Sequence, residues 1–249
     1  MMKNYLVTIA YDGTDYHGWQ VQPNGITVQQ TVQDAVEKIL GKRENIIGCS
    51  RTDAGVHANE FCFNMRTHKD IIPFRFVGGM NAVLPDDIAV KNCQEVDIDF
   101  HARYDCKGKE YVYKIWNSPS RNPFCEGRYL HYKKKIDASF LNEQAQQFVG
   151  KHDFSSFCAS KSSVEDTVRT VEYFSVSSSE EEVIFKVKAD GFLYNMVRIM
   201  IGTLLEVSEG KIPADTIGDI IESKSREKAG RTVPPYGLYL NKVFYYIGN

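Results

Sequence analysis

A run of residues around Asp53 has the side chains that a catalytic loop needs. The run covers residues 48–58 and lies between two predicted strands. Gly55 permits a tight turn, and small residues such as Ala54 leave space beside the carboxylate for a planar ligand. Asp53 can act as a nucleophile or as a base, with Arg51 or another cation holding it ionised. The alternative is an aspartate that only hydrogen-bonds its own turn.

Arg198 is a second candidate because it is a charged residue in an apolar stretch. It lies within residues 195–202, where most of its neighbours are Met, Val and Ile. An unpaired guanidinium in an apolar interior is strongly destabilising, so a buried Arg198 needs a partner, and Asp53 is the natural candidate. The alternative is a side chain that reaches solvent along the surface of an interfacial helix.

Residues 101–135, called the basic segment below, have a composition suited to nucleic acid. The segment holds nine Lys and Arg residues against three acidic ones, interleaved with seven Tyr, Trp and Phe residues. Cationic side chains contact phosphates and aromatic rings stack on bases, which is how many proteins bind single-stranded RNA. The alternative is that half of the aromatic rings face the core and the lysines only form a solvated edge.

The composition of the whole chain limits the class of protein. Its 249 residues include 30 Lys and Arg and 32 Asp and Glu, a formal charge of −2 that excludes a polybasic protein. With 43% hydrophobic residues the chain can bury a sizeable core, and no apolar run approaches the roughly 20 residues of a membrane span. The six cysteines include no Cys-x-x-Cys pair, so we expect no metal site. The short apolar run at the N-terminus does not suit a signal peptide, so we expect a cytoplasmic protein with free thiols.

Apolar periodicity predicts two successive β-α-β-β-α-β patterns. In the first, Thr27 is expected to cap a helix, and the elements are strands 5–11, 45–49, 56–65 and 88–96 and helices 28–39 and 73–83. In the second, the elements are strands 109–116, 168–176, 183–189 and 238–246 and helices 137–149, 192–207 and 213–221. The polar residues 177–182 are predicted to form only a solvated turn. The two patterns predict an α+β protein with two ferredoxin-like halves, residues 1–103 and 104–249.

Ordered blocks along nearly the whole chain resemble the tRNA pseudouridine synthase A family. The run Arg-Thr-Asp-Ala-Gly-Val-His-Ala at residues 51–58 is similar to the signature of that family. The other blocks that carry the resemblance are residues 9–20, 27–29, 81–88, 100–103, 109–113, 152–157, 191–198 and 237–240. Two residues beside the expected site, Ser50 and Val233, depart from those usual in the family.

The resemblance implies a fold, an activity and a set of site residues. The fold is two ferredoxin-like halves that form a continuous, mostly antiparallel sheet with a central RNA-binding cleft. The activity is isomerisation of uridine to pseudouridine at positions 38, 39 and 40 in the anticodon stem-loop of tRNA. The catalytic aspartate falls on Asp53, the active-site tyrosine on Tyr111, and the arginine that pairs with the aspartate on Arg198. The family also implies a homodimer whose subunits share each tRNA, and no cofactor or metal.

These residue types suit the reaction, although they leave its first step open. Uracil must leave C1′ through N1, rotate and reattach through C5. Asp53 could attack C1′, add to C6 of the base, or remove the 2′ proton. Tyr111 could stack on the base and help to remove the C5 proton. Two other functions remain as alternatives, namely a pseudouridine synthase for other RNA uridines and a non-catalytic tRNA-binding protein.

Overall fold

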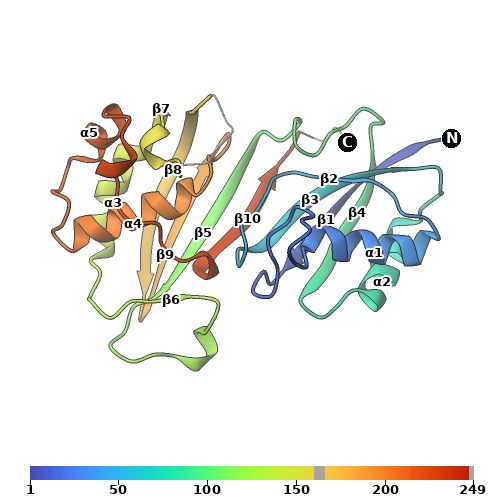
Figure 1. Ribbon diagram of the computed structural model, residues 1–249, viewed down its shortest axis with the longest axis horizontal. Helices are drawn as coiled ribbons and strands as arrows, with labels where there is room; N and C mark the ends of the chain where they lie inside the picture. Colours follow the sequence, from blue (N-terminus) through green and yellow to red (C-terminus); the bar gives the residue numbers. More distant parts are fainter. Residues whose placement is uncertain (160–165, 247–249) are drawn as a thin grey trace. The chain divides into compact units, whose positions relative to one another are not determined.

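The computed structural model describes residues 1–159 and 166–246 (Figure 1). The chain folds into two compact units, one of Met1–Lys107 with Tyr239–Asn249 and one of Gly108–Leu238. Each unit combines helices with mostly antiparallel strands, so the predicted α+β class is confirmed. The ferredoxin-like halves at residues 1–103 and 104–249 remain a proposal. In the part of the chain that the structure describes, no helix is both long enough and apolar enough to cross a membrane.

The first unit is built on a sheet in which β3 is central. Its elements are β1 (Lys3–Tyr11), α1 (Val28–Leu40), β2 (Ile46–Gly48), β3 (His57–Thr67), α2 (Pro73–Val83), β4 (Ile88–Val96) and most of β10 (Leu238–Phe244). β1 lies between β4 and β3 and is antiparallel to both. On its other side β3 pairs with β2 in antiparallel fashion and with β10 in parallel fashion. Helices α1 and α2 pack against one another (Figure 1).

Local sequence signals account for these elements. Thr27 Oγ1 accepts a hydrogen bond from the backbone N–H of Gln30, so Thr27 is the predicted helix cap. The helix ends at Gly41, which adopts the left-handed conformation with φ 72°. The core includes Trp19, whose ring stacks on Phe61 with centroids 4.0 Å apart. These rings are almost completely buried, which ties the segment after β1 to the sheet.

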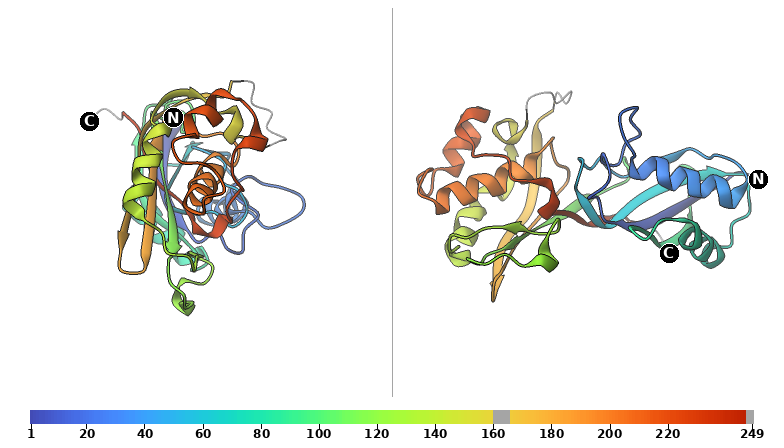
Figure 2. Two further views of the ribbon diagram at one scale, coloured as in Figure 1. Left: turned by 90° about the vertical axis from the view of Figure 1, so that its left-hand side faces the viewer. Right: turned by 60° about the horizontal axis from the view of Figure 1, so that its bottom comes forward.

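Within the second unit the strands follow the order β5-β9-β8-β7, and each neighbouring pair is antiparallel. Figure 2 shows the long hairpin of β8 and β9 in gold and orange. Its elements are β5 (Gly108–Trp116), β6 (Leu130–His131), α3 (Ala138–Ala145), β7 (Gly150–Asp153), β8 (Val168–Ser179), β9 (Glu182–Ala189), α4 (Met196–Ser208) and α5 (Ile217–Glu222). The short β6 pairs with β5 in parallel fashion. Ten of the 13 residues of α4 are buried, so this helix forms the centre of the unit's helical layer.

Three predicted boundaries are wrong because of backbone conformations that periodicity does not reveal. α4 begins at Met196 rather than at residue 192, since Asn195 adopts a left-handed conformation with φ 60°. α5 begins at Ile217 rather than at residue 213, and Asp215 has φ 61°. α3 ends at Ala145 and is followed by a single 3₁₀ turn, and Gly150 begins the unpredicted strand β7.

The prediction that residues 177–182 form only a solvated turn is also wrong. β8 continues to Ser179, which pairs with Glu182 of β9, so the turn contains only two residues. The carbonyl of Glu181 accepts a hydrogen bond from the backbone N–H of Asn117 at 2.6 Å. Its carboxylate accepts a second from Ser118 Oγ at 2.5 Å. The hairpin tip therefore anchors the chain where it leaves β5.

Candidate active site

The loop that carries Asp53 is held by the segment that follows β1. The carbonyl of Thr52 accepts a hydrogen bond from Trp19 N at 3.2 Å, and Thr52 Oγ1 lies 2.8 Å from the hydroxyl oxygen of Tyr11. The N–H of Gly55 donates to the carbonyl of Tyr16 at 3.3 Å. These bonds fix the backbone on both sides of Asp53.

Two glycines allow that segment to lie directly against the loop. A Cβ atom on Gly13 would lie 2.0 Å from the carbonyl oxygen of Val56. A Cβ on Gly18 would lie 2.4 Å from the carbonyl oxygen of Thr52, and Gly18 also has a φ of 79°. Any side chain at either position would push the loop away. Gly55 has a φ of 75°, as expected for the predicted tight turn.

His57 supports the same loop from its C-terminal side. It is buried at the first position of β3, and its Nδ1 accepts a hydrogen bond from Gly13 N at 3.0 Å. Its ring stacks on Tyr239 of β10, with centroids 4.6 Å apart. His57 is thus a support for the Asp53 loop, a role that the sequence did not assign, although its place within the run at residues 51–58 was a signal for it.

Asp53 and Arg51 lie in this one loop but differ in exposure. The side chain of Asp53 is half-buried, and the backbone carbonyl of Asp53 accepts a hydrogen bond from Val56 N at 3.1 Å that closes the turn. Arg51 is exposed. A half-buried carboxylate remains reachable by a substrate while part of its hydration is removed, which suits a nucleophile or a base.

Tyr111 belongs to the second unit and lies on β5. It pairs with Val187 of β9 and is 7% exposed. Phe192, which precedes α4, meets the ring of Tyr111 edge to face, with centroids 5.1 Å apart and an interplanar angle of 87°. This contact restrains the tyrosine ring, and nothing in the sequence pattern singled out Phe192 for it.

Arg198 is held in the first turn of α4 by two oxygen acceptors. Its Nη1 donates to Asn195 Oδ1 at 2.7 Å, and its Nε donates to the carbonyl of Val233 at 2.8 Å. Val233 also donates its N–H to the carbonyl of Arg198. The arginine is half-buried, and these bonds orient its guanidinium. Because Asp53 belongs to the other unit, its pairing with Arg198 remains a prediction.

The basic segment divides between surface and core. The cationic residues with exposed side chains are Arg103, Lys107, Arg121, Arg128, Lys133, Lys134 and Lys135. Tyr104 and Phe124 are 74% and 88% exposed, which leaves their rings available for stacking. Tyr113 is buried, and its hydroxyl donates to the carbonyl of Pro234 at 2.9 Å. Burial lowers the pKa of Lys114, whose ammonium lies over the ring of Tyr129.

The described residues contain no group of three or more His, Cys, Asp and Glu side chains that could hold a metal ion. The residues expected at the site are divided between the two units, with Asp53 in the first and Tyr111 and Arg198 in the second.

Comparisons with known proteins assign the family. Residues 7–105 and 144–246 match the model of a family described as tRNA pseudouridine synthase. The tRNA pseudouridine synthase A of Acetivibrio thermocellus is 48% identical over 244 residues, which cover 98% of this chain and 100% of that protein. The proteins of the same name from Clostridium acetobutylicum and Thermoanaerobacter sp. strain X514 are 46% and 44% identical over the same shares of both chains. With a match along nearly its whole length, this chain belongs to the tRNA pseudouridine synthase family.

Proposed function

We propose that this protein isomerises uridine to pseudouridine at positions 38, 39 and 40 in the anticodon stem-loop of tRNA. The observation that carries the proposal is the half-buried carboxylate of Asp53 on a loop whose backbone is fixed on both sides. A catalytic group gains most from being held in place before the substrate arrives. The relatives named tRNA pseudouridine synthase A support the choice of substrate.

Asp53 is the proposed catalytic residue. The reaction breaks the N1–C1′ bond, rotates the uracil, forms the C5–C1′ bond and moves the C5 proton to N1, so atoms and electrons balance without an oxidant or a cofactor. Asp53 begins it by attack on C1′, by addition to C6 or by removal of the 2′ proton. Each route needs an ionised carboxylate, and the cation proposed to favour that form is Arg198.

Tyr111 is the residue proposed to contact the uracil base of the target nucleotide. Its ring is restrained by Phe192, so it can stack on the uracil without losing further rotational freedom. Its hydroxyl is the group proposed to help remove the C5 proton. The exposed cations and rings of the basic segment supply contacts to phosphates and unstacked bases, which offset the cost of extracting the target nucleotide. We propose that Arg51 assists by holding Asp53 ionised, and that the protein acts as a cytoplasmic homodimer.

Tritium release tests the catalytic assignment. The substrate is tRNA with tritium at C5 of its uridines, because that hydrogen must leave when C5 becomes bonded to C1′. The wild type should release tritium, while Asp53→Asn should be slower by at least about 10³-fold, as is typical when a nucleophile is removed. Asp70→Asn is the matched control, since Asp70 is an exposed aspartate of the same unit that pairs with Lys3.

The outcomes separate the three candidate functions. Equal release by the wild type and Asp53→Asn would refute the role of Asp53. Binding of tRNA without release by the wild type would favour a non-catalytic tRNA-binding protein. Release from uridines other than those at positions 38, 39 and 40, located by mapping the modified nucleotides, would favour a synthase for other sites.

A further inference from the structure

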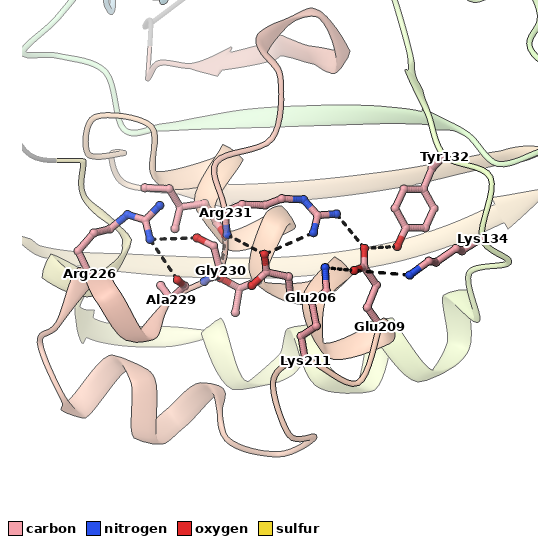
Figure 3. Close-up of polar contacts among 11 residues, drawn as sticks. Tyr132, Lys134, Glu206, Glu209, Lys211, Arg226, Ala229, Gly230 and Arg231 are labelled. Carbon is pink, nitrogen blue, oxygen red and sulfur yellow. Dashed lines mark hydrogen bonds and ion pairs between the residues drawn. The ribbon is translucent and has the colours of Figure 1, made fainter.

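Arg231 lies between two carboxylates at the C-terminal end of α4, that of Glu206 in the last turn and that of Glu209 directly after the helix. Figure 3 shows its guanidinium reaching Glu206 and Glu209 on the same side of the helix. Nη2 donates to Glu209 Oε1 at 3.0 Å and Nη1 to Glu206 Oε1 at 3.4 Å. The backbone N–H of Arg231 donates to the same Glu206 oxygen at 3.2 Å. Both the main chain and the side chain of Arg231 are thereby tied to α4.

Glu209 is the more strongly held of the two carboxylates. Its side chain is only 6% exposed, and Lys211 Nζ lies 2.6 Å from its Oε2. The hydroxyl of Tyr132 donates to its Oε1 at 2.7 Å, and Lys134 Nζ lies 3.7 Å from its Oε2 (Figure 3). The bonds from Lys211, Tyr132 and Arg231 lower the pKa of Glu209 to about 2. The carboxylate is therefore ionised near neutral pH and binds the arginine as an anion.

Arg231 belongs to a strap, residues 229–234, that runs against α4 without intervening side chains. A Cβ on Gly202 would lie 1.8 Å from the carbonyl oxygen of Arg231. A Cβ on Gly230 would lie 2.7 Å from Cα of Thr203, and Gly230 N donates to Thr203 Oγ1 at 2.9 Å. These close contacts fix the position of the strap along α4, and the bonds from Arg231 to Glu206 and Glu209 hold the strap in that position.

The same strap orients Arg198. Two residues after Arg231, the buried Val233 accepts a hydrogen bond from Arg198 Nε and donates one to the carbonyl of Arg198. A displacement of the strap would therefore move the acceptor that sets the direction of the guanidinium. Near the other end of α4, Arg231 determines where the strap lies.

We propose that Arg231, held by Glu206 and Glu209, is a positioning residue that fixes the Val233 carbonyl and so aims Arg198 at the substrate site. The proposal rests on the role in the proposed function that we give to Arg198. Arg231 touches neither substrate nor reacting atoms. Its effect on the reaction comes through the strap alone.

Steady-state kinetics on tRNA test the proposal. Arg231→Ala should lower kcat about tenfold, because misplacing a catalytic group by a fraction of an ångström to 1 Å costs up to about 100-fold. KM should stay within about twofold of its wild-type value, because the substrate contacts are unchanged. Arg231→Lys, which keeps a cation for Glu209, should recover most of the lost kcat. Near-UV circular dichroism of each variant checks that the unit is folded.

Lys211→Ala is the matched control. The substitution removes another cation from the Glu209 carboxylate. Because Lys211 lies outside the strap, kcat should stay at the wild-type value. A double variant supplies the sharper test. In an Arg198→Lys background, which lacks the Nε donor to Val233, Arg231→Ala should cause no further loss of kcat.

Four outcomes would overturn the proposal. A wild-type kcat for Arg231→Ala alongside a reduced kcat for Arg198→Lys would refute it and leave the proposed function standing. A raised KM with unchanged kcat would make Arg231 a phosphate contact. Additive losses of kcat in the double variant would show that the two arginines act independently. A wild-type kcat for Arg198→Lys would remove the role of Arg198 and the proposal with it.

Discussion

Replacing Gly202 by alanine is expected to separate the strap from α4. The new Cβ would lie 1.8 Å from the carbonyl oxygen of Arg231, and real Cβ contacts are almost never under 3.0 Å, so a gap of at least 1.2 Å must open. Overpacking of this kind costs up to about 3 kcal/mol, and a helical Gly→Ala change returns up to about 1 kcal/mol. The net loss of about 2 kcal/mol corresponds to a fall in Tm of about 4–8 °C for a chain of this size.

Gly218 of α5 provides the matched control in the same unit. A Cβ there would lie 4.0 Å from Gln147 Oε1, which is ordinary van der Waals contact. Gly218→Ala should therefore raise Tm by a few degrees through helix propensity alone, by about 0.5–1 kcal/mol. Differential scanning calorimetry of the two variants makes the comparison. If Gly202→Ala were as stable as Gly218→Ala, the close packing of the strap on α4 would be refuted.

Three further predictions concern the loop, the carboxylate cluster and the RNA surface. Tyr11→Phe removes the buried bond to Thr52 Oγ1 and should lower the free energy of unfolding in urea by about 1 kcal/mol, and no loss would mean that this bond does not hold the loop. The pKa of Glu209 is lowered from 4.5 to about 2, so the stability it contributes is present above pH 4.5 and is lost as the pH falls towards 2. Glu209→Gln should accordingly have a smaller free energy of unfolding than the wild type at pH 7, and that free energy should fall less between pH 4.5 and 2. If urea titrations at each pH gave the same fall for both proteins, this role of Glu209 would be contradicted. Affinity for tRNA, measured by filter binding, should fall at least about tenfold between roughly 50 and 200 mM salt, and a flat dependence would exclude phosphate contacts by the basic segment.

The elements predicted most accurately are those with local signals. The predicted strand at residues 88–96 coincides with β4, and the helix capped by Thr27 ends within one residue of its predicted end. In both elements the apolar residues have the spacing of a strand or a helix, and a turn or cap residue marks the boundary. These signals lie within a short stretch of sequence, so the sequence alone reveals them. In contrast, β6 and β7 contain only two and four residues, too few for any periodicity to be visible.

The late starts of α4 and α5 have a different cause. Asn195 and Asp215 adopt positive φ values that Asn and Asp permit but do not require. The side chain of Asn195 accepts a bond from Arg198 in the same segment, whereas Asp215 exchanges hydrogen bonds with Gln144, far away in the chain. Apolar periodicity reveals neither contact, and the partner of Asp215 lies outside any local window of sequence.

For the candidate site, residue types indicated the groups that can do chemistry but not those that hold them. Asp53, Tyr111 and Arg198 stand out by type, motif or context. Val233 acts through its main-chain carbonyl, which every residue has, so its identity could not reveal its role as an acceptor. The same holds for Tyr16, whose carbonyl binds Gly55 N. Supports made by the backbone become visible only in three dimensions.

The route of β10 has a consequence for how the protein is made. Synthesis proceeds from the N-terminus, yet the strand that completes the first unit consists mostly of residues that the ribosome adds only after the whole second unit. Until Tyr239 and Leu240 have emerged, β3 lacks its parallel neighbour and the ring of His57 lacks the tyrosine on which it stacks. A nascent chain that carries every proposed catalytic residue therefore still has an unfinished Asp53 loop. The ribosome must therefore finish the second unit before the Asp53 loop can reach its final form.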